Sequence, residues 1–249
     1  MGETTRREIL LVPHLFRASN IDSAARAAQL LQQAGIEVRL LEQEQMDVIE
    51  TNPVLCGLTR AKADDSAAAG CELVLVLGGD GTFLRAASYA RAQDIPVLGI
   101  NLGHVGFLAE GEASSLEKVI GQVIDRSYRV VERMTLDVSV IGEGGEVLGR
   151  SWALNECSIE NSDRTRVLDA TLEVDFRPVS SFGCDGVLIS TPTGSTAYAF
   201  SAGGPVMWPQ LDAILVVPNN AHALFAKPLV VAPTSTVAVE SEQQTTQAV

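Results

Sequence analysis

The 249-residue sequence has few aromatic residues and far fewer basic than acidic ones. Phe, Trp and Tyr together make up 5% of it, so a core must be built mainly from Val, Leu, Ile and Ala, within a hydrophobic share of 46%. The net charge of −13 argues against an extended nucleic-acid-binding surface, because such a surface needs clustered Lys and Arg. A nucleotide ligand is not excluded, since backbone N–H groups, helix N-termini and bound cations also hold phosphate.

Cysteines are also few, and they are scattered without a Cys-x-x-Cys pair: Cys56, Cys71, Cys157 and Cys184. We expect them to stay reduced and to form no metal site. No hydrophobic run is long enough for a membrane span, and the N-terminal residues lack the apolar stretch of a secretory signal peptide. We therefore expect a cytoplasmic protein with no membrane partner.

The first half of the sequence alternates apolar runs with amphipathic stretches. This predicts strands over 7–12, 36–41, 72–77 and 95–100, and helices over 20–35, 82–93 and 114–124. The first helix could be capped by Asp22 or Ser23 and ended by Gly35. The polar stretch 42–70 has little periodicity, and we expect it to be the most mobile part. Fully apolar strands alternating with helices indicate a parallel sheet covered on both faces.

The second half has the strict alternation of half-buried antiparallel strands. The segments "TLDVSV" and "TLEVDF" alternate in this way, and "GEGGE" predicts a hairpin turn after the first. The expected fold class is therefore α/β, with an N-terminal doubly wound parallel-sheet domain over residues 1–126 and a second, β-rich domain over 127–249.

A glycine-rich loop, "GGDG", follows the predicted strand 72–77 and isolates one carboxylate, Asp80. Such a loop lies at the carboxyl edge of a parallel sheet, where open α/β sheets bind ligands, and a following helix offers free N–H groups. The alternative is an ordinary turn in which Asp80 only caps a helix. The loop is not a Walker A motif, because no Gly-Lys-Ser/Thr follows, and it lacks the third glycine of a dinucleotide fingerprint.

Three further segments carry polar or aromatic groups next to predicted strands. Phe107 in "NLGHVGF" could stack on a flat ring or belong to the core. Asn155 and Glu156 in "ALNECSIE" could bind ribose hydroxyls or a base edge, or they could face water on an edge strand. The run "STPTGSTAYAF" could form a polar nest for a ribose or phosphate, or a capped helix in a tight turn.

Taken together, these segments resemble the NAD kinase family, in an actinobacterial style. The matching motifs are "LGGDGTFLRAA", "NLGHVGFLAE", "ALNECSIE", "GCDGVLISTPTGSTAYAFSAGGP" and "PNNAHALFAKPLVV". The resemblance implies transfer of a phosphoryl group from ATP or inorganic polyphosphate to the 2′-hydroxyl of the adenosine ribose of NAD, giving NADP. It also implies a divalent metal, usually Mg²⁺, small-molecule nucleotides as partners, and a homo-oligomer, commonly a dimer or a tetramer.

The resemblance also implies roles for individual residues. Asp80 would be the catalytic proton acceptor, because the ribose hydroxyl must lose its proton as the new bond forms. The nucleotide-binding residues would be Gly79, Gly81, Arg85, Phe107, Asn155, Glu156, Arg166, Asp185, Thr196, Ala197, Tyr198, Ala199, Phe200 and Ser201. No metal-binding residue is assigned.

The sequence departs from the family pattern in two places. Gly183 stands where many members carry a basic residue, and family members continue beyond Val249 with further strands, so we expect the β-rich domain to be incomplete at its C-terminal end. A non-catalytic pyridine-nucleotide sensor is therefore an alternative. A lipid or sugar kinase is a third, but no basic amphipathic stretch supports it, and it leaves Asn155 and Glu156 unexplained.

Overall fold

The structure, a computed structural model, describes residues 6–14, 18–42, 49, 51–101, 111–112, 116–161, 166–221, 227–241 and 246–248. The chain divides into two compact units, Met1–Val130 and Val131–Val249. The domain boundary that the sequence suggests, between residues 126 and 127, stays a prediction.

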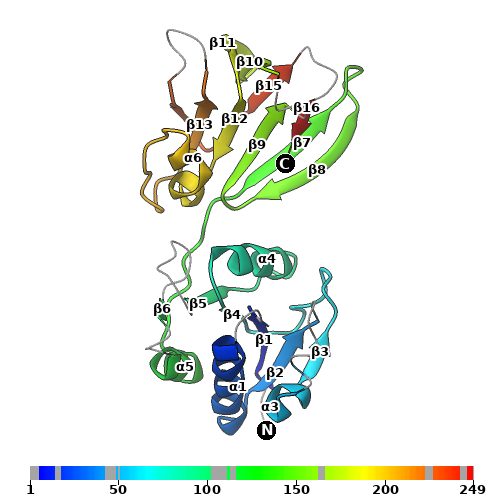
Figure 1. The fold of residues 1–249 in the computed structure, drawn as a ribbon, viewed down its shortest axis with the longest axis vertical. Helices are drawn as coiled ribbons and strands as arrows, with labels where there is room; N and C mark the ends of the chain where they lie inside the picture. The colour runs from blue at the N-terminus through cyan, green and yellow to red at the C-terminus, as the bar shows by residue number, and fades with distance from the viewer. Residues whose placement is uncertain are drawn as a thin grey trace. The chain divides into compact units, whose positions relative to one another are not determined.

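Unit 1 contains a parallel sheet with the strand order β3-β2-β1-β4-β5-β6 (Figure 1). Its elements are β1 (Glu8–Pro13), α1 (Ala18–Gln33), β2 (Glu37–Leu41), α3 (Pro53–Cys56), β3 (Thr59–Ala61), β4 (Leu73–Leu77), α4 (Asp80–Arg91), β5 (Val97–Asn101), β6 (Gly111–Glu112) and α5 (Leu116–Ile124). The predicted parallel-sheet domain is thereby confirmed.

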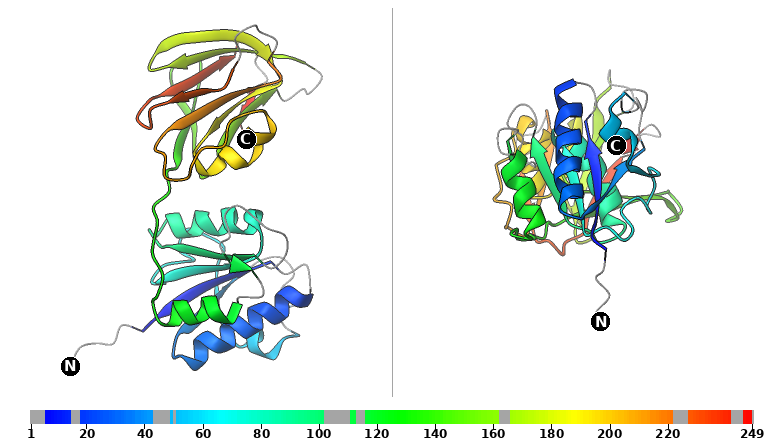
Figure 2. Two further views of the ribbon diagram at one scale, coloured as in Figure 1. Left: turned by 90° about the vertical axis from the view of Figure 1, so that its left-hand side faces the viewer. Right: turned by 90° about the horizontal axis from the view of Figure 1, so that it is seen from below.

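Helices cover both faces of this sheet, as Figure 2 shows. Ile9 and Leu11 of β1 pack in the hydrophobic cluster that includes α1 and α5, whereas Leu10 and Val12 pack in the cluster that includes α4. Each central strand therefore buries both of its faces. This explains why β4 reads as an unbroken apolar run in which all positions are buried.

One detail of unit 1 differs from the sequence-based expectations, and another adds to them. Helix α1 begins at Ala18, so neither Asp22 nor Ser23 caps it. The polar stretch 42–70 contains α3 and the edge strand β3, and its mobility stays a prediction. Asn52 caps α3, since its side chain accepts hydrogen bonds from the N–H groups of Val54 (3.0 Å) and Leu55 (3.2 Å). Residues 43–48 and 50 of that stretch lie outside the described residues.

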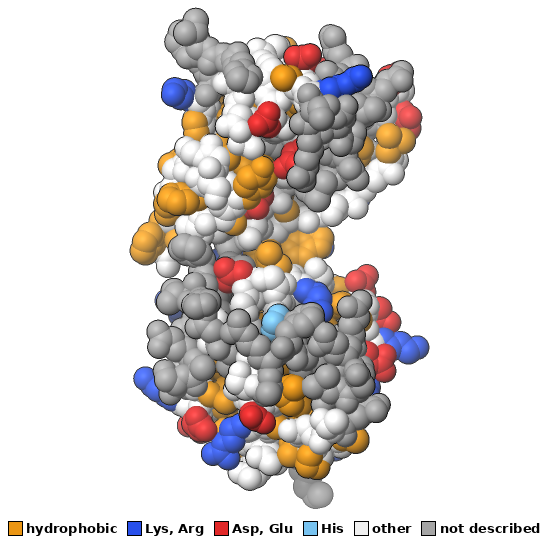
Figure 3. Space-filling model, in the orientation of Figure 1, with side chains coloured by type: hydrophobic (Ala, Val, Ile, Leu, Met, Phe, Trp, Pro, Cys, Tyr) orange, Lys and Arg blue, Asp and Glu red, His pale blue; other side chains and the backbone are white. Residues whose placement is uncertain are grey.

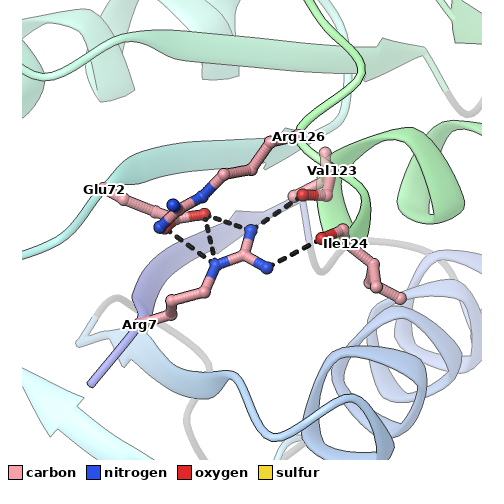
Figure 4. A network of polar contacts seen from close by, with 5 residues as sticks. All are labelled: Arg7, Glu72, Val123, Ile124 and Arg126. Atoms are coloured by element: carbon pink, nitrogen blue, oxygen red, sulfur yellow. Dashed lines mark hydrogen bonds and ion pairs between the residues drawn. The ribbon is translucent and has the colours of Figure 1, made fainter. Parts of the chain in front are cut away.

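A polar network ties the end of α5 to the amino ends of the two central strands (Figure 4). Arg7, directly before β1, donates to the carboxylate of Glu72, directly before β4 (Nε–Oε2 2.9 Å), and to the carbonyl oxygens of Val123 and Ile124 (2.8 Å each). Arg126 donates to Glu72 as well (2.8 Å). The hydrogen bond from Arg7 is the main reason why the pKa of Glu72 lies below its usual value.

Unit 2 is built almost entirely of antiparallel strands. Its elements are β7 (Leu136–Ile141), β8 (Val147–Ala153), β9 (Glu156–Asn161), β10 (Leu168–Val174), β11 (Arg177–Cys184), β12 (Gly186–Ser190), the 3-10 helix η2 (Thr193–Thr196), α6 (Tyr198–Ser201), β13 (Ile214–Asn219), β14 (Leu229–Val231), β15 (Val237–Ser241) and β16 (Thr246–Ala248). They form sheets in the orders β14-β13-β12-β9-β16, β11-β10-β15 and β7-β8.

The central strands β12 and β13 of the five-stranded sheet are buried on both faces, and the side chains of β12 alternate between the two. Val187 packs in the core cluster that includes strands β10 and β11, whereas Leu188 packs with Ala199 of α6. The β-rich second domain predicted from the sequence is thereby confirmed. Among the described residues, no helix of either unit is long and apolar enough to cross a membrane.

Candidate functional site

The glycine-rich loop of unit 1 lies where two central strands of the sheet end. β4 stops at Leu77 and α4 starts at Asp80, with Gly79 as its N-cap. β1 and β4 are neighbours in the sheet, but their following helices, α1 and α4, cover opposite faces. The carboxyl ends of such a strand pair form the crevice in which open α/β sheets bind ligands.

Asp80 stands half-buried between two exposed glycines in this loop. A Cβ atom on Gly79 or on Gly81 would meet no atom within 4 Å. The backbone beside Asp80 is therefore open to a ligand. The N–H groups of Thr82 (3.0 Å) and Phe83 (3.1 Å) donate to the carbonyl oxygen of Gly79, the N-cap. Arg85, also predicted as a binding residue, is exposed on α4 one turn further on.

The second candidate group lies in unit 2, where β9 begins. Asn155 Oδ1 and Glu156 Oε2 are buried, and neither atom has a hydrogen-bond partner among the residues that the structure describes. Burial raises the pKa of Glu156, and a hydrogen bond from the backbone N–H of Tyr198 opposes this shift in part. Two adjacent buried acceptors without donors are costly, so this pair is suited to a ligand that carries hydroxyl or N–H donors.

Two side-chain hydroxyls of the loop after β12 form hydrogen bonds that fix its backbone. Thr191 Oγ1 donates to Leu154 O and accepts from the N–H of Gly194 (3.1 Å). Ser195 Oγ donates to Pro192 O (2.7 Å) and accepts from Met207 N–H (2.9 Å). These two buried hydroxyls therefore bond to backbone groups, and they fix the loop rather than form a nest for a ligand.

Two asparagines at the end of β13, which the sequence analysis did not select, bond to predicted site residues. Asn219 Nδ2 donates to Tyr198 Oη (3.1 Å), and Asn220 Nδ2 donates to Asp185 Oδ2 (2.8 Å). Tyr198 therefore contacts Glu156 through its backbone and Asn219 through its ring oxygen. The structure thus brings two predicted site residues, Glu156 and Tyr198, into contact. Asp185 lies before β12, at the end of that strand opposite Ser190, which pairs with Glu156.

The other predicted binding residues of unit 2 differ in exposure. Ala199 is fully buried in the cluster beneath α6, Phe200 and Ser201 are exposed, and Thr196 and Ala197 are half-buried. Arg166 is exposed two residues before β10 begins. Phe107 lies outside the described residues. The binding roles of all these residues stay predictions.

Sequence comparisons identify the family. Residues 9–128 match the model of the ATP-NAD kinase N-terminal domain, and residues 154–249 match that of the ATP-NAD kinase C-terminal domain. A curated NAD kinase from Corynebacterium efficiens is 68% identical over 248 residues, covering 100% of this chain and 78% of that protein. A curated NAD kinase from Rhodococcus opacus is 58% identical, covering 96% of this chain and 78% of that protein.

Solved structures share the fold at lower identity. A yeast NADH kinase in complex with NADH has a TM-score of 0.85 and 22% identity, covering 99% of this chain and 75% of the other. An NAD kinase from Archaeoglobus fulgidus in complex with ATP has a TM-score of 0.67 and 24% identity, covering 97% and 86%. Since the family models span both units and the curated relatives are this similar, the chain belongs to the NAD kinase family.

Proposed function

We propose that the chain transfers a phosphoryl group from ATP or inorganic polyphosphate to the 2′-hydroxyl of the adenosine ribose of NAD, giving NADP. The observation that carries this proposal is a single carboxylate, Asp80, set between open glycines at the switch point of a parallel sheet, in a chain of the NAD kinase family. This arrangement suits phosphoryl transfer, which depends on positioning and charge stabilisation more than on covalent chemistry.

Asp80 is the proposed proton acceptor. The ribose hydroxyl attacks the terminal phosphorus, and its proton passes to the Asp80 carboxylate as the new P–O bond forms and the bond to the leaving phosphate breaks. Gly79 and Gly81 carry no side chain, so the hydroxyl and the phosphate chain can both approach this carboxylate. The N-terminal N–H groups of α4 stabilise the charge on the transferring phosphoryl group.

NAD is bound, in this proposal, by the polar group of unit 2. The unpartnered oxygens of Asn155 and Glu156 accept hydrogen bonds from neighbouring ribose hydroxyls, which satisfies both buried atoms. Tyr198, held by Asn219, stacks on a flat ring of the nucleotide. Thr196, Ala197, Ser201 and Asp185 add further contacts.

In this proposal, Mg²⁺ binds mainly to the phosphates of the phosphoryl donor. No group of three His, Cys, Asp or Glu side chains that could hold a metal is present within the described part of the chain. Mg²⁺ needs no such cage, because it usually binds through substrate phosphates and one or two carboxylates. Asp80 or Glu156 could supply such an oxygen, and bound Mg²⁺ neutralises charge on the donor.

We also propose a homo-oligomer and a cytoplasmic location. Large apolar side chains are exposed around α6 (Figure 3), namely Phe200, Val206, Trp208 and Leu211. Exposed apolar groups that gather in this way are typical of protein interfaces. All four cysteines are free, as expected in a reducing compartment. Light scattering on the purified chain tests the first point.

The test of the proposed function is NADP formation from NAD and Mg²⁺, with ATP and polyphosphate supplied in separate reactions. We expect turnover with at least one donor. NAD binding without turnover for either donor would contradict the proposal and favour the non-catalytic sensor. The same reactions with NADH in place of NAD show whether the reduced nucleotide is accepted.

A further inference from the structure

Two neighbouring asparagines stand at the end of β13 beside two residues that are predicted to bind the nucleotide. Asn219 Nδ2 donates to Tyr198 Oη (3.1 Å), and the Asn219 carbonyl oxygen accepts a hydrogen bond from the N–H of Asp185 (3.0 Å). Gly186 pairs with Asn219 in the sheet, so Asp185 directly precedes the last residue pair between β12 and β13. Tyr198 and Asp185 are therefore bonded to the same residue.

These bonds connect the two ends of the candidate site in unit 2. The backbone N–H of Tyr198 donates to Glu156, which pairs with Ser190 at one end of β12. The ring oxygen of Tyr198 accepts a hydrogen bond from Asn219 at the other end of β12, where Asp185 lies. Tyr198 therefore links the part of the site around Glu156 to the part around Asp185.

The second asparagine, Asn220, holds the Asp185 carboxylate at one oxygen. Its Nδ2 atom lies 2.8 Å from Asp185 Oδ2, a typical distance for a hydrogen bond to an ionised group. A carboxylate only accepts, so the NH₂ end of the Asn220 amide must face it. Asn220 also has a left-handed backbone (φ 49°), which asparagine tolerates better than most residues with a Cβ atom. Asparagine at this position therefore satisfies both the backbone conformation and the hydrogen bond.

The second oxygen of the Asp185 carboxylate remains available to a ligand. Asp185 is exposed, and among the residues that the structure describes none donates to its Oδ1 atom. Because Asn220 restrains the side chain through Oδ2, the position of Oδ1 is restricted before a ligand arrives, which lowers the entropic cost of binding. Such an acceptor suits an NH₂ group, and NAD carries one on its carboxamide and one on its adenine.

We propose that Asn220 is a positioning residue for NAD, which orients the Asp185 carboxylate so that Oδ1 accepts a hydrogen bond from an NH₂ group of the nucleotide. The inference rests on the proposed function for the identity of the ligand. Losing the restraint weakens the affinity for NAD but leaves the acceptor in the site. The loss of the Asn220 amide should therefore raise the KM of NAD and leave kcat nearly unchanged.

The experiment measures the dissociation constant of NAD by calorimetry without a phosphoryl donor, and kcat and the KM values of NAD and ATP, for the whole chain. We expect Asn220→Gly to weaken NAD binding and raise the KM of NAD by about fivefold, as for the loss of one hydrogen bond, with the KM of ATP unchanged. Glycine keeps the left-handed backbone without strain. Asn220→His, which also tolerates this backbone and can donate through Nδ1–H, should recover most of the affinity.

Asn220→Gly should have no further effect when Asp185 is already alanine, because positioning acts through Asp185. Two analogues of NAD locate the NH₂ group: one carries a carboxylate in place of the carboxamide, and the other carries hypoxanthine in place of adenine. The difference in affinity between wild type and Asn220→Gly should vanish for one of them. Asp94→Gly, at an exposed residue of unit 1 with a similar backbone (φ 54°), is the matched control. Thermal midpoints show that each variant is folded.

Several outcomes would overturn the inference. Equal NAD affinity of folded Asn220→Gly and wild type would remove Asn220 from the site, and Asn220→His no better than Asn220→Gly would exclude an N–H donor. The same loss of affinity in the Asp185→Ala background would exclude action through Asp185, and a loss that persists with both analogues would exclude an NH₂ group. A wild type that binds no NAD would overturn both this inference and the proposed function. If the wild type binds NAD but forms no NADP, the proposed function fails while the binding comparison still decides the role of Asn220.

Discussion

Gly194 lies so close to Asn155 that a methyl group on its α-carbon would collide with the Asn155 carbonyl group. The same carbonyl accepts hydrogen bonds from the N–H of Thr191 (2.8 Å) and the hydroxyl of Ser190 (3.2 Å). The loop after β12 is thus pressed against the start of β9. The positions of the two buried acceptors on Asn155 and Glu156 depend on this close approach, because the loop contacts and hydrogen-bonds the backbone of Asn155.

Gly194→Ala should therefore weaken NAD binding by tenfold or more, because backbone must move to make room for the new Cβ atom. Calorimetric titration with NAD measures this. Gly149→Ala is the matched control, since a Cβ atom at Gly149 would meet nothing within 4 Å. Equal NAD affinity in Gly194→Ala and wild type would show that this contact does not set the site.

Glu156→Gln should lower NAD affinity by about tenfold, because the amide puts donor hydrogens where the proposal requires an acceptor. The shape of the side chain is kept, so the fold should tolerate the change. Glu240→Gln, at an exposed position of β15, controls for the loss of one charge. A normal NAD dissociation constant in Glu156→Gln would contradict the assignment of Glu156 to the nucleotide.

The hairpin between β10 and β11 turns through two residues with left-handed backbone, Asp175 (φ 52°) and Phe176 (φ 63°). Phe176 is 85% exposed, so its ring gains little from burial. Its left-handed backbone is strained, because the Cβ atom crowds the following carbonyl group. Phe176→Gly should raise the free energy of unfolding by about 1 kcal/mol, measured by urea denaturation.

Asp175→Gly is the contrasting variant, and it should destabilise the chain. The Asp175 carboxylate accepts hydrogen bonds from the N–H of Thr236 (2.9 Å) and the hydroxyl of Ser235 (3.2 Å), which glycine cannot replace. A loss of stability in Phe176→Gly would mean that the exposed ring makes contacts that outweigh the backbone strain.

The sequence predicted the elements that local pattern determines and missed those that depend on distant contacts. The apolar run of β4 and the glycines after it were enough to locate Asp80. The four-residue helix α3 is too short for a periodic signal. Sequence patterns could not show that the hydroxyls of Thr191 and Ser195 bond to the backbone, because those partners lie in distant segments that only folding brings close.

Contacts between residues far apart in the sequence could not be predicted from local patterns, for the same reason. Asn219 contacts Tyr198 across 21 positions, and the contact exists only because β13 pairs with β12 beside α6. His14 is a lone histidine after a strand, and only the pairing of β1 with β4 places it next to Gly78.

The ion pair between Arg7 and Glu72 predicts a pH-dependent stability. The folded-state pKa of Glu72 is lowered, so its contribution is present above the unfolded-state pKa of about 4.3 and is lost as the pH falls through the folded-state value. Glu72→Gln should cost about 1–3 kcal/mol of unfolding free energy at pH 7. The difference from wild type should shrink toward pH 3. A difference that stays constant from pH 7 to pH 3 would contradict this account.

The most direct test of the central claim is NADP formation by wild type and Asp80→Asn, with NAD binding measured on the same samples. Asp80→Asn should lower kcat by about 10²–10⁴, as expected for loss of a proton acceptor, and leave the NAD dissociation constant nearly unchanged. Asp137→Asn, on exposed β7, should behave like wild type. Full turnover by Asp80→Asn would show that Asp80 is not the proton acceptor.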